Sequence, residues 1–446
     1  MSEASRDRGG ERPSGGGDLS LLAGREPGPP EPLGLWEGYG IELEYMIVDA
    51  ATLDVRPVAD RLLASVAGEE GASDVDRGPL SWSNELALHV IEFKTNGPAE
   101  SLVGLAERFQ KDVHEATEHL ARLGAVLLPG GMHPWMDPAS ELRLWPHEYN
   151  DVYRAFDRIF GCRGHGWANL QSTHLNLPFR GEDEFFRLHE AIRLVLPLIP
   201  ALAASSPILD GRRGPALDNR LLAYRDNARR VASVTGRVVP ERVHTPTEYR
   251  HEVLERIYRD LAPLDPEGIL HDEWVNARGA IARFHRGSIE IRVIDSQECP
   301  AADVAVAAAV VGAVRYLADG PLRDPEHGSA LGMEIMVDVL ERTIHQGEAA
   351  SIDALEYRAV LGMEGAHAPT AGEVWRHLVE VGLATWPGAD EWSGALEVIL
   401  EEGCLSRRIV TALGEGPTWP RERLEAVYRR LAACLAAGEM FDAGAG

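Results

Sequence analysis

The spacing of apolar residues predicts strands and helices along residues 36–300, and helices alone after them. Apolar and polar residues alternate over residues 40–49, 170–177 and 288–295, which is the pattern of half-buried strands, and residues 126–128 form a shorter apolar strand. The period lengthens to about 3.6 over residues 98–123, 183–204, 246–262 and 301–437, which predicts helices. We therefore expect an α+β fold: a mixed or antiparallel sheet with packed helices, followed by a helical C-terminal part.

The composition divides the chain into three parts. Residues 1–35 contain eight glycines and five prolines, so they cannot bury enough apolar surface to fold, and we expect a disordered tail there. The remaining length exceeds the ~250–300 residues at which single cores stop growing. We expect a catalytic core over residues 36–300 and a helical region over residues 301–446 that packs on it.

Charge excludes several classes of partner. The formal net charge is −26, which opposes binding to nucleic acid and to anionic lipid. Only Lys94 and Lys111 of the 44 basic residues are lysines, so any anion site must use arginine and backbone amides.

The longest clean apolar run, residues 304–314, is short of the ~20 residues that span a membrane. Four cysteines without a CxxC pair indicate a reduced, cytoplasmic protein.

Carboxylates occur on the predicted strands among apolar neighbours. Glu42 and Glu44 leave the same face of one strand, because side chains alternate with a period of two. Glu85 and Glu92 lie in a second apolar segment. Since they are seven residues apart, either a bulge separates them or Glu85 precedes the strand.

Two further strands carry polar faces. His174 shares a face with Asn176, and Glu290 shares one with Arg292. Five glutamates and one histidine on core strands suit a hard cation, Mg²⁺ or Mn²⁺, rather than Zn²⁺.

Each pattern alone has a plainer interpretation. Glu42 and Glu44 could form a solvated strand face, His174 could be a hydrogen-bonded core histidine, and Glu290 could pair with Arg292 across strands. The joint occurrence on four separate segments favours the metal site.

These segments carry a family resemblance. The motifs GIELEY (40–45), ELALHVIEFKT (85–95), STHLN (172–176) and SIEIRVIDSQE (288–298) resemble those of the glutamate–cysteine ligase family, in order, spacing and strand context. That family has the glutamine-synthetase-like carboxylate–amine ligase fold. The resemblance covers residues 40–300 and implies three cation sites between ATP and the substrate.

The resemblance also implies residue roles. Glu44, Glu85 and Glu92 would hold one metal near the substrate. Glu42, His174 and Glu290 would hold another against the phosphates of ATP, where Arg292 would stabilise the transferring phosphoryl group and Asn176 would lie at the substrate.

Further arginines are candidates for anion binding. Arg278, Arg283 and Arg286 precede the Glu290 strand and could bind ATP phosphates, although surface-loop arginines look the same in a sequence. The segment SSP (205–207) followed by glycines resembles a family segment whose arginine approaches the amino-acid substrate, which makes Arg220 and Arg225 candidates.

The sequence thus predicts an ATP-dependent ligase that joins the γ-carboxylate of glutamate to the amine of cysteine, as in glutathione biosynthesis. The amine itself stays open, because the ARGAIARFHR segment (277–286) suggests a distinct branch. A di-metal hydrolase of amides or phosphate esters is the alternative from another class, and a catalytically silent relative is a third. Whether the chain forms a homo-oligomer is left open.

Overall fold

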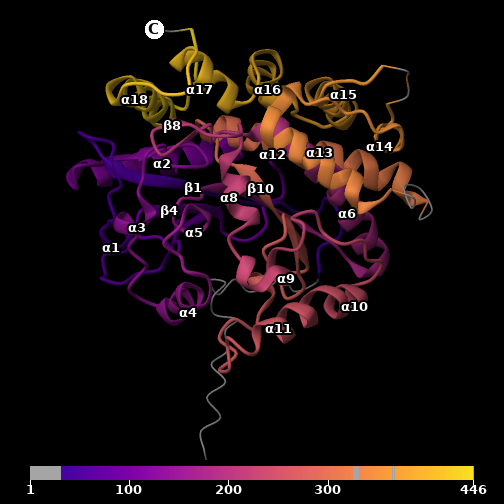
Figure 1. Cartoon of the computed structure of the whole chain (residues 1–446), viewed down its shortest axis with the longest axis horizontal. Coiled ribbons are helices and arrows are strands. Elements are labelled where there is room, and N and C mark those ends of the chain that lie inside the picture. The colour runs from indigo at the N-terminus through magenta and orange to yellow at the C-terminus, as the bar shows by residue number, and fades with distance from the viewer. Residues whose placement is uncertain (1–31, 325–330, 364, 366, 445–446) are drawn as a thin grey trace, which may run out of the picture.

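The computed structural model describes residues 32–444, except 325–330, 364 and 366. The predicted disordered tail (1–35) therefore lies almost wholly outside the described residues. Figure 1 shows a central sheet with the C-terminal helices gathered on one side and α10 and α11 on the other.

The centre of the molecule is an antiparallel sheet, with strand order β2-β3-β4-β1-β6-β10-β9 and β5 paired with one end of β1. The predicted α+β class is confirmed. The strands of this sheet are β1 (Gly40–Asp49), β2 (Asp74–Asp76), β3 (Leu80–Asn84), β4 (Val90–Thr95), β5 (Ala125–Leu128), β6 (Ser172–Pro178), β9 (Ala280–Arg283) and β10 (Ser288–Asp295), and a separate pair consists of β7 (Ile208–Leu209) and β8 (Arg212–Arg213).

The register around β1 brings polar residues side by side. Glu42 lies opposite Lys94 of β4 on one side and His174 of β6 on the other, and Glu44 lies opposite Glu92. Because directly opposed residues have Cβ atoms about 5 Å apart, the strand pairing alone assembles these side chains on one face.

The other face of the sheet is apolar and rests on α12 (Pro300–Asp319). Asp303 of this helix accepts hydrogen bonds from the hydroxyls of Tyr45 and Thr173, both at 2.6 Å. Burial raises the pKa of Asp303 to about 6 despite these bonds. Helix α12 is long and apolar enough to cross a membrane, but 83% of its apolar window is buried inside the molecule, as expected of a central core helix.

Three predicted helices differ in their limits. Helix α2 (Leu105–Arg122) begins later than expected because Gly104 has a left-handed backbone (φ 80°). Two prolines divide residues 183–204 into α6 (Gly181–Val195), the 3₁₀ turn Leu196–Leu198 and α7 (Ile199–Ala203). Residues 246–262 contain a π-helical turn, Arg250–Leu254, between α10 (Pro246–Tyr249) and α11 (Glu255–Leu261).

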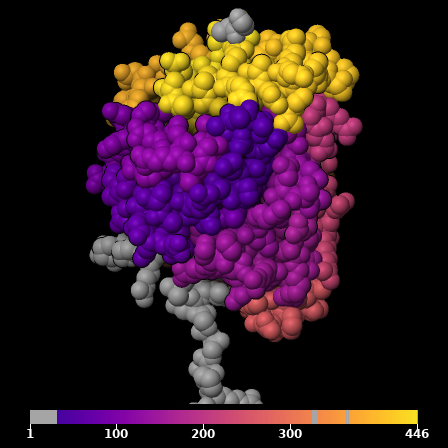
Figure 2. Space-filling view, turned by 90° about the vertical axis from the view of Figure 1, so that its left-hand side faces the viewer, coloured from indigo at the N-terminus to yellow at the C-terminus, as the bar shows by residue number. Residues whose placement is uncertain are grey.

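The face of β1 that carries Glu42 and Glu44 becomes apolar further along the strand. Met46 and Val48 pack with Leu405, Ile409 and other residues of the C-terminal helices in a second core. Figure 2 shows these helices (yellow) covering one side of the N-terminal half of the chain (indigo and purple).

The predicted helical C-terminal part is confirmed in the described residues. After α12 it consists of α13 (Met333–Gln346), α14 (Leu355–Val360), α15 (Ala371–Leu383), α16 (Asp390–Glu402), α17 (Leu405–Leu413) and α18 (Arg421–Ala437). The remaining helices are α1 (Ala59–Ala67), α3 (Pro138–Glu141), α4 (Asn150–Phe160), α5 (His165–Ala168), α8 (Asn219–Arg225) and α9 (Ala232–Thr235), with short 3₁₀ turns at Arg229–Val231, Glu273–Val275, Pro321–Arg323 and Gly347–Ala349.

Candidate active site

A cavity of about 880 Å³ lies on the polar face of the sheet. Its floor is formed by β1, β4, β6, β9 and β10. Four of these strands, β1, β4, β6 and β10, contribute a group that we call the acidic floor: Glu42, Glu44, Glu92, His174 and Glu290. Residues outside the sheet complete the wall, and among them are the aromatic residues Tyr149, Tyr153, Phe156, Trp167, Tyr224 and Trp274.

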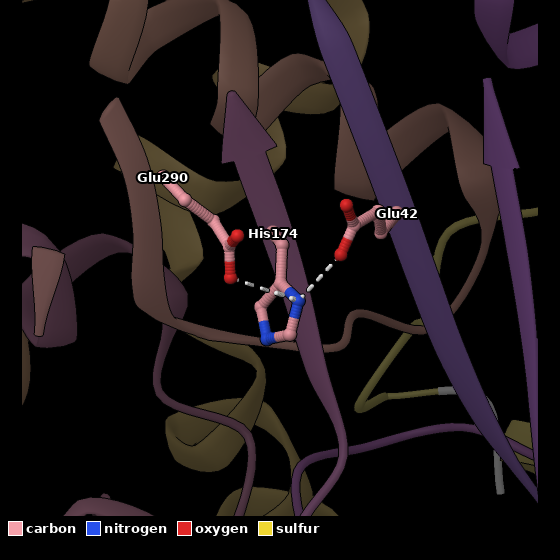
Figure 3. A group of neighbouring side chains, drawn as sticks. All are labelled: Glu42, His174 and Glu290. Carbon is pink, nitrogen blue, oxygen red and sulfur yellow. Dashed lines mark hydrogen bonds and ion pairs between the residues drawn. The ribbon is translucent and has the colours of Figure 1, made fainter. Parts of the chain in front are cut away.

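Glu42, His174 and Glu290 converge from three neighbouring strands, β1, β6 and β10 (Figure 3). The Nδ1 atom of His174 lies 2.8 Å from Oε2 of Glu42 and 4.0 Å from Oε1 of Glu290. Burial alone would lower the pKa of His174, but the hydrogen bond to Glu42 and the charge of Glu44 outweigh burial and raise the pKa to about 9. This group, expected from the sequence, is brought together with ligand atoms close enough to share one metal ion.

Arginines surround the Glu290 end of this group. Nη1 of Arg283 donates to Oε2 of Glu290 at 2.7 Å, and Nε of Arg292 lies 2.8 Å from Oε1 of the same carboxylate. Arg286 lies 3.6 Å from Glu42. Burial would raise the pKa of Glu290, but the charges of Arg292 and Arg283 outweigh it and lower the pKa. We call Glu290, Arg283 and Arg292 the arginine end of the cavity.

A second group of ligands consists of Glu44, Glu92 and, again, His174. The backbone amide of Ser172 donates to Oε2 of Glu44 at 2.8 Å, and the Ser172 hydroxyl lies 2.9 Å from Nε2 of His174. His174 therefore stands between both groups, and it replaces Glu85 in the second one.

Glu85 lies between β3 and β4, directly after Asn84, so the second of the two alternatives for its spacing from Glu92 is the one observed. Its carboxylate lines the same cavity and accepts a hydrogen bond from the amide of Leu86 at 3.3 Å. Burial, followed by the charges of Glu44 and Glu92, raises the pKa of Glu85 well above its usual value. We call Glu44, Glu85 and Glu92 the acidic end of the cavity.

Lys94 is a cavity residue that the sequence analysis did not select. Its Nζ lies 2.9 Å from Oδ2 of Asp74 and 3.4 Å from Oε1 of Glu92, and it donates to the hydroxyl of Ser83 at 3.0 Å. The signal was present in the sequence, since Lys94 follows Glu92 by two residues and so shares its strand face.

Arg220 and Arg225, both predicted to approach the substrate, are held by acidic partners. Arg220 lines the cavity, but its guanidinium is bound by Asp295 and by the carbonyl of Arg292. Arg225 pairs with Glu341 and is not among the lining residues.

Arg278 is buried away from the cavity lining. Its guanidinium donates to Glu241 at 2.7 Å and to the carbonyl of Ser233 at 3.0 Å. The structure thus brings Arg283, Arg286 and Arg292 to the cavity and leaves Arg225 and Arg278 in ion pairs elsewhere. Asn176 lines the cavity and donates to Oε1 of Glu42 at 3.1 Å.

The donor set fits hard divalent cations. Carboxylate oxygens predominate, with one imidazole and no thiolate in either group. Burial raises the pKa of Glu92 to about 7, although Lys94 lowers it in part, and repulsion from the charges of Glu42 and Glu44 adds to the increase. A bound cation would remove that repulsion.

Comparison with known proteins decides the family. The sequence profile of glutamate-cysteine ligase family 2 matches residues 39–366. The chain belongs to this family. The resemblance found in the sequence is confirmed, and the protein is an ATP-dependent carboxylate–amine ligase.

The relatives include an uncharacterized protein of Archaeoglobus fulgidus, 33% identical over 404 residues, which covers 90% of this chain and 99% of that one. A protein of Rubrobacter xylanophilus, provisionally named glutamate–cysteine ligase 2-3, is 29% identical over 273 residues, 60% of this chain and 66% of its own.

Among solved structures, the glutamate–cysteine ligase of Francisella tularensis in complex with AMP is similar with a TM-score of 0.56. It is 12% identical and the match covers 91% of this chain and 90% of that one. This likeness shows the shared fold, so the predicted glutamine-synthetase-like architecture is confirmed.

Proposed function

We propose that the protein joins the γ-carboxylate of glutamate to the amine of cysteine at the expense of ATP. The observation that carries the proposal is the juxtaposition of two carboxylate–histidine groups with Arg283, Arg286 and Arg292 in one cavity. Transfer of a phosphoryl group needs charge neutralisation and positioning more than covalent help, and this cavity offers both.

In the proposed reaction the γ-carboxylate of glutamate attacks the γ-phosphorus of ATP, which gives γ-glutamyl phosphate and ADP. The amine then attacks the acyl carbon and phosphate leaves. Mg²⁺ or Mn²⁺ would neutralise phosphate and carboxylate charge. One ion would be held by Glu42, His174 and Glu290, and another by Glu44 and Glu92 with Glu85 beside them. Arg283 donates to Glu290, and the guanidinium of Arg292 lies beside the same carboxylate, so both arginines are near enough to the metal ligands to bind the transferred phosphoryl group.

A ligase for a different amine is the second candidate. The aromatic wall of the cavity favours it, because Tyr149, Tyr153 and Trp167 line the cavity and would suit an amine with an apolar or aromatic side chain. The di-metal hydrolase is less well supported, since attack by metal-bound water does not need arginines beside the metal-binding carboxylate.

The deciding experiment is an assay of ADP release with ATP, Mg²⁺ and glutamate across a panel of amines, with the γ-glutamyl product identified by mass spectrometry. We expect release that depends on glutamate, and a preferred amine that yields a stoichiometric amide. ADP release that persists in excess EDTA would contradict the role of the metal, and release of products without nucleotide would indicate the hydrolase. We also propose a cytoplasmic protein of glutathione biosynthesis, which the preference for cysteine would support.

A further inference from the structure

Lys94 is unusual in both type and place. It is one of two lysines in a chain of 446 residues, and the other, Lys111, lies exposed on α2. Lys94 instead lines the cavity beside carboxylates that a divalent cation would bind. Its side chain is 16% exposed, so its ammonium group is largely removed from water.

The contacts of Lys94 are those of a bound cation. Its ammonium group approaches two carboxylates, from Asp74 and Glu92, and a hydroxyl, from Ser83. The Ser83 hydroxyl in turn donates to the same Oε1 of Glu92, at 2.6 Å. Three oxygen atoms within 3.4 Å thus surround one positive charge that cannot leave the protein.

We propose that Lys94 is a built-in cation of the acidic end, which holds the Glu92 carboxylate in place and competes with a divalent ion for it. The inference rests on the proposed binding of metal by Glu44 and Glu92. Because the charge of the ammonium group lies 3.4 Å from Oε1 of Glu92, this end needs less metal charge and binds a divalent ion more weakly than its carboxylates alone would. Lys94 is a positioning residue, since it acts through Glu92.

The test measures binding of Mn²⁺ by electron paramagnetic resonance, in the absence of ATP and glutamate. Lys94→Met should bind Mn²⁺ about tenfold more tightly, because one positive charge near the site has been removed. Lys94→Arg, which keeps the charge, and Lys111→Met, which removes the exposed lysine, should both match the wild type within about twofold. An unchanged Mn²⁺ affinity in Lys94→Met would overturn the inference.

A second measurement needs no variant. Protein labelled with ¹³C and ¹⁵N in lysine has two side-chain ammonium signals, and addition of Mg²⁺ should shift that of Lys94 and leave that of Lys111 in place. A Lys94 signal that does not move would overturn the inference, as would a Lys94→Met variant whose only defect is a raised KM for glutamate.

If the wild type binds Mn²⁺ but Lys94→Met does not differ from it, the inference fails while the proposed ligase function stands. If no amine is ligated but Lys94→Met binds Mn²⁺ more tightly, the ligase function fails and the inference stands.

Discussion

Both ends of the cavity contain buried glutamates, but their pKa values are shifted in opposite directions. At the arginine end, Glu290 is 1% exposed, yet Arg292 and Arg283 hold its pKa below the usual value. At the acidic end, burial and neighbouring carboxylates raise the pKa of Glu85 and Glu92. The protein therefore pairs Glu290 with two arginines, whereas at the acidic end Lys94 compensates the carboxylates only in part.

This difference distinguishes a site from a structural ion pair. Elsewhere in the core, Asp295 is bound by Arg220 and by the hydroxyl of Ser206, and Glu298 is bound by Arg408, so each of these two buried acids has its own arginine. Buried charges without partners cost several kcal/mol, so a cation bound at the acidic end would stabilise the carboxylates beyond what Lys94 supplies.

The largest expected effect concerns the arginine end. Arg292→Lys keeps the charge but loses the planar guanidinium, so kcat should fall about 10²-fold or more, with the KM for glutamate much less affected. Glu290→Gln should also lose activity, but raised Mg²⁺ should restore part of it, because that variant lacks a metal ligand. A titration of kcat with Mg²⁺, together with melting curves, separates the two. Equal losses of stability with no response to Mg²⁺ would mean a purely structural pair.

Metal should stabilise the wild-type protein by relieving the acidic end. Saturation with Mg²⁺ or Mn²⁺ at about 100 times Kd would add about 2.7 kcal/mol to the free energy of unfolding. Differential scanning calorimetry with EDTA and with graded Mg²⁺ measures this directly. A melting temperature that is the same in EDTA and in saturating Mg²⁺ would contradict a metal site here.

Glu85→Gln should make the metal-free protein more stable at pH 8, by about 1 kcal/mol. The folded-state pKa of Glu85 is raised, so the folded state binds a proton that the unfolded state releases, and stability is lost as pH rises above about 4.5. Glutamine removes that loss. Glu290→Gln, the matched change at the arginine end, should lower stability in EDTA because it removes the negative charge that lies beside two arginines. Denaturant unfolding at several pH values measures the change in the free energy of unfolding for each variant. If both variants change it in the same direction, the two ends of the cavity do not differ as described.

The smallest effect at neutral pH lies outside the cavity. Burial, and then the charge of Arg193, lowers the pKa of His189 to about 3, and its ring stacks on Phe185. The unfolded state gains a proton near pH 6.5 that the folded state refuses, so stability should fall as pH drops from about 6.5 toward 3. His189→Phe should flatten this slope by up to about 1.4 kcal/mol per pH unit. If the slope is unchanged, other groups cause the loss of stability in acid. The pH dependence attributed to Glu85 would then have to be compared with the contribution of those groups.

The sequence predicted most of the floor because strands alternate strictly. A period of two places Glu42 with Glu44 and Glu290 with Arg292 without knowledge of any partner strand. It could not predict that His174 would stand between both groups, because that depends on the register of β6 against β1.

The arginines were harder because loops and helices direct side chains by tertiary contacts. Arg278 and Arg283 are neighbours in sequence, but Glu241 draws the first away and Glu290 draws the second in. Arg225 could have been separated from Arg220, since residues five apart on a helix such as α8 point in different directions. Half of the aromatic wall had a signal in the sequence, because Tyr149, Tyr153 and Phe156 are spaced by four and three residues from the N-cap of α4 onward, but the others come from separate short elements.

The position of His174 between two groups restricts how the cavity can be loaded. A neutral imidazole has one lone pair, so the ring can ligate a single ion, and the other ion must be held by oxygen alone. The two places are therefore chemically unequal, one with a nitrogen donor and one without. Since the pKa of His174 is raised to about 9, the ring carries a proton at pH 7 that an incoming ion must displace. Loading is then an exchange of a proton for a cation, and acid released into a weakly buffered solution would count the ions that bind at the ring.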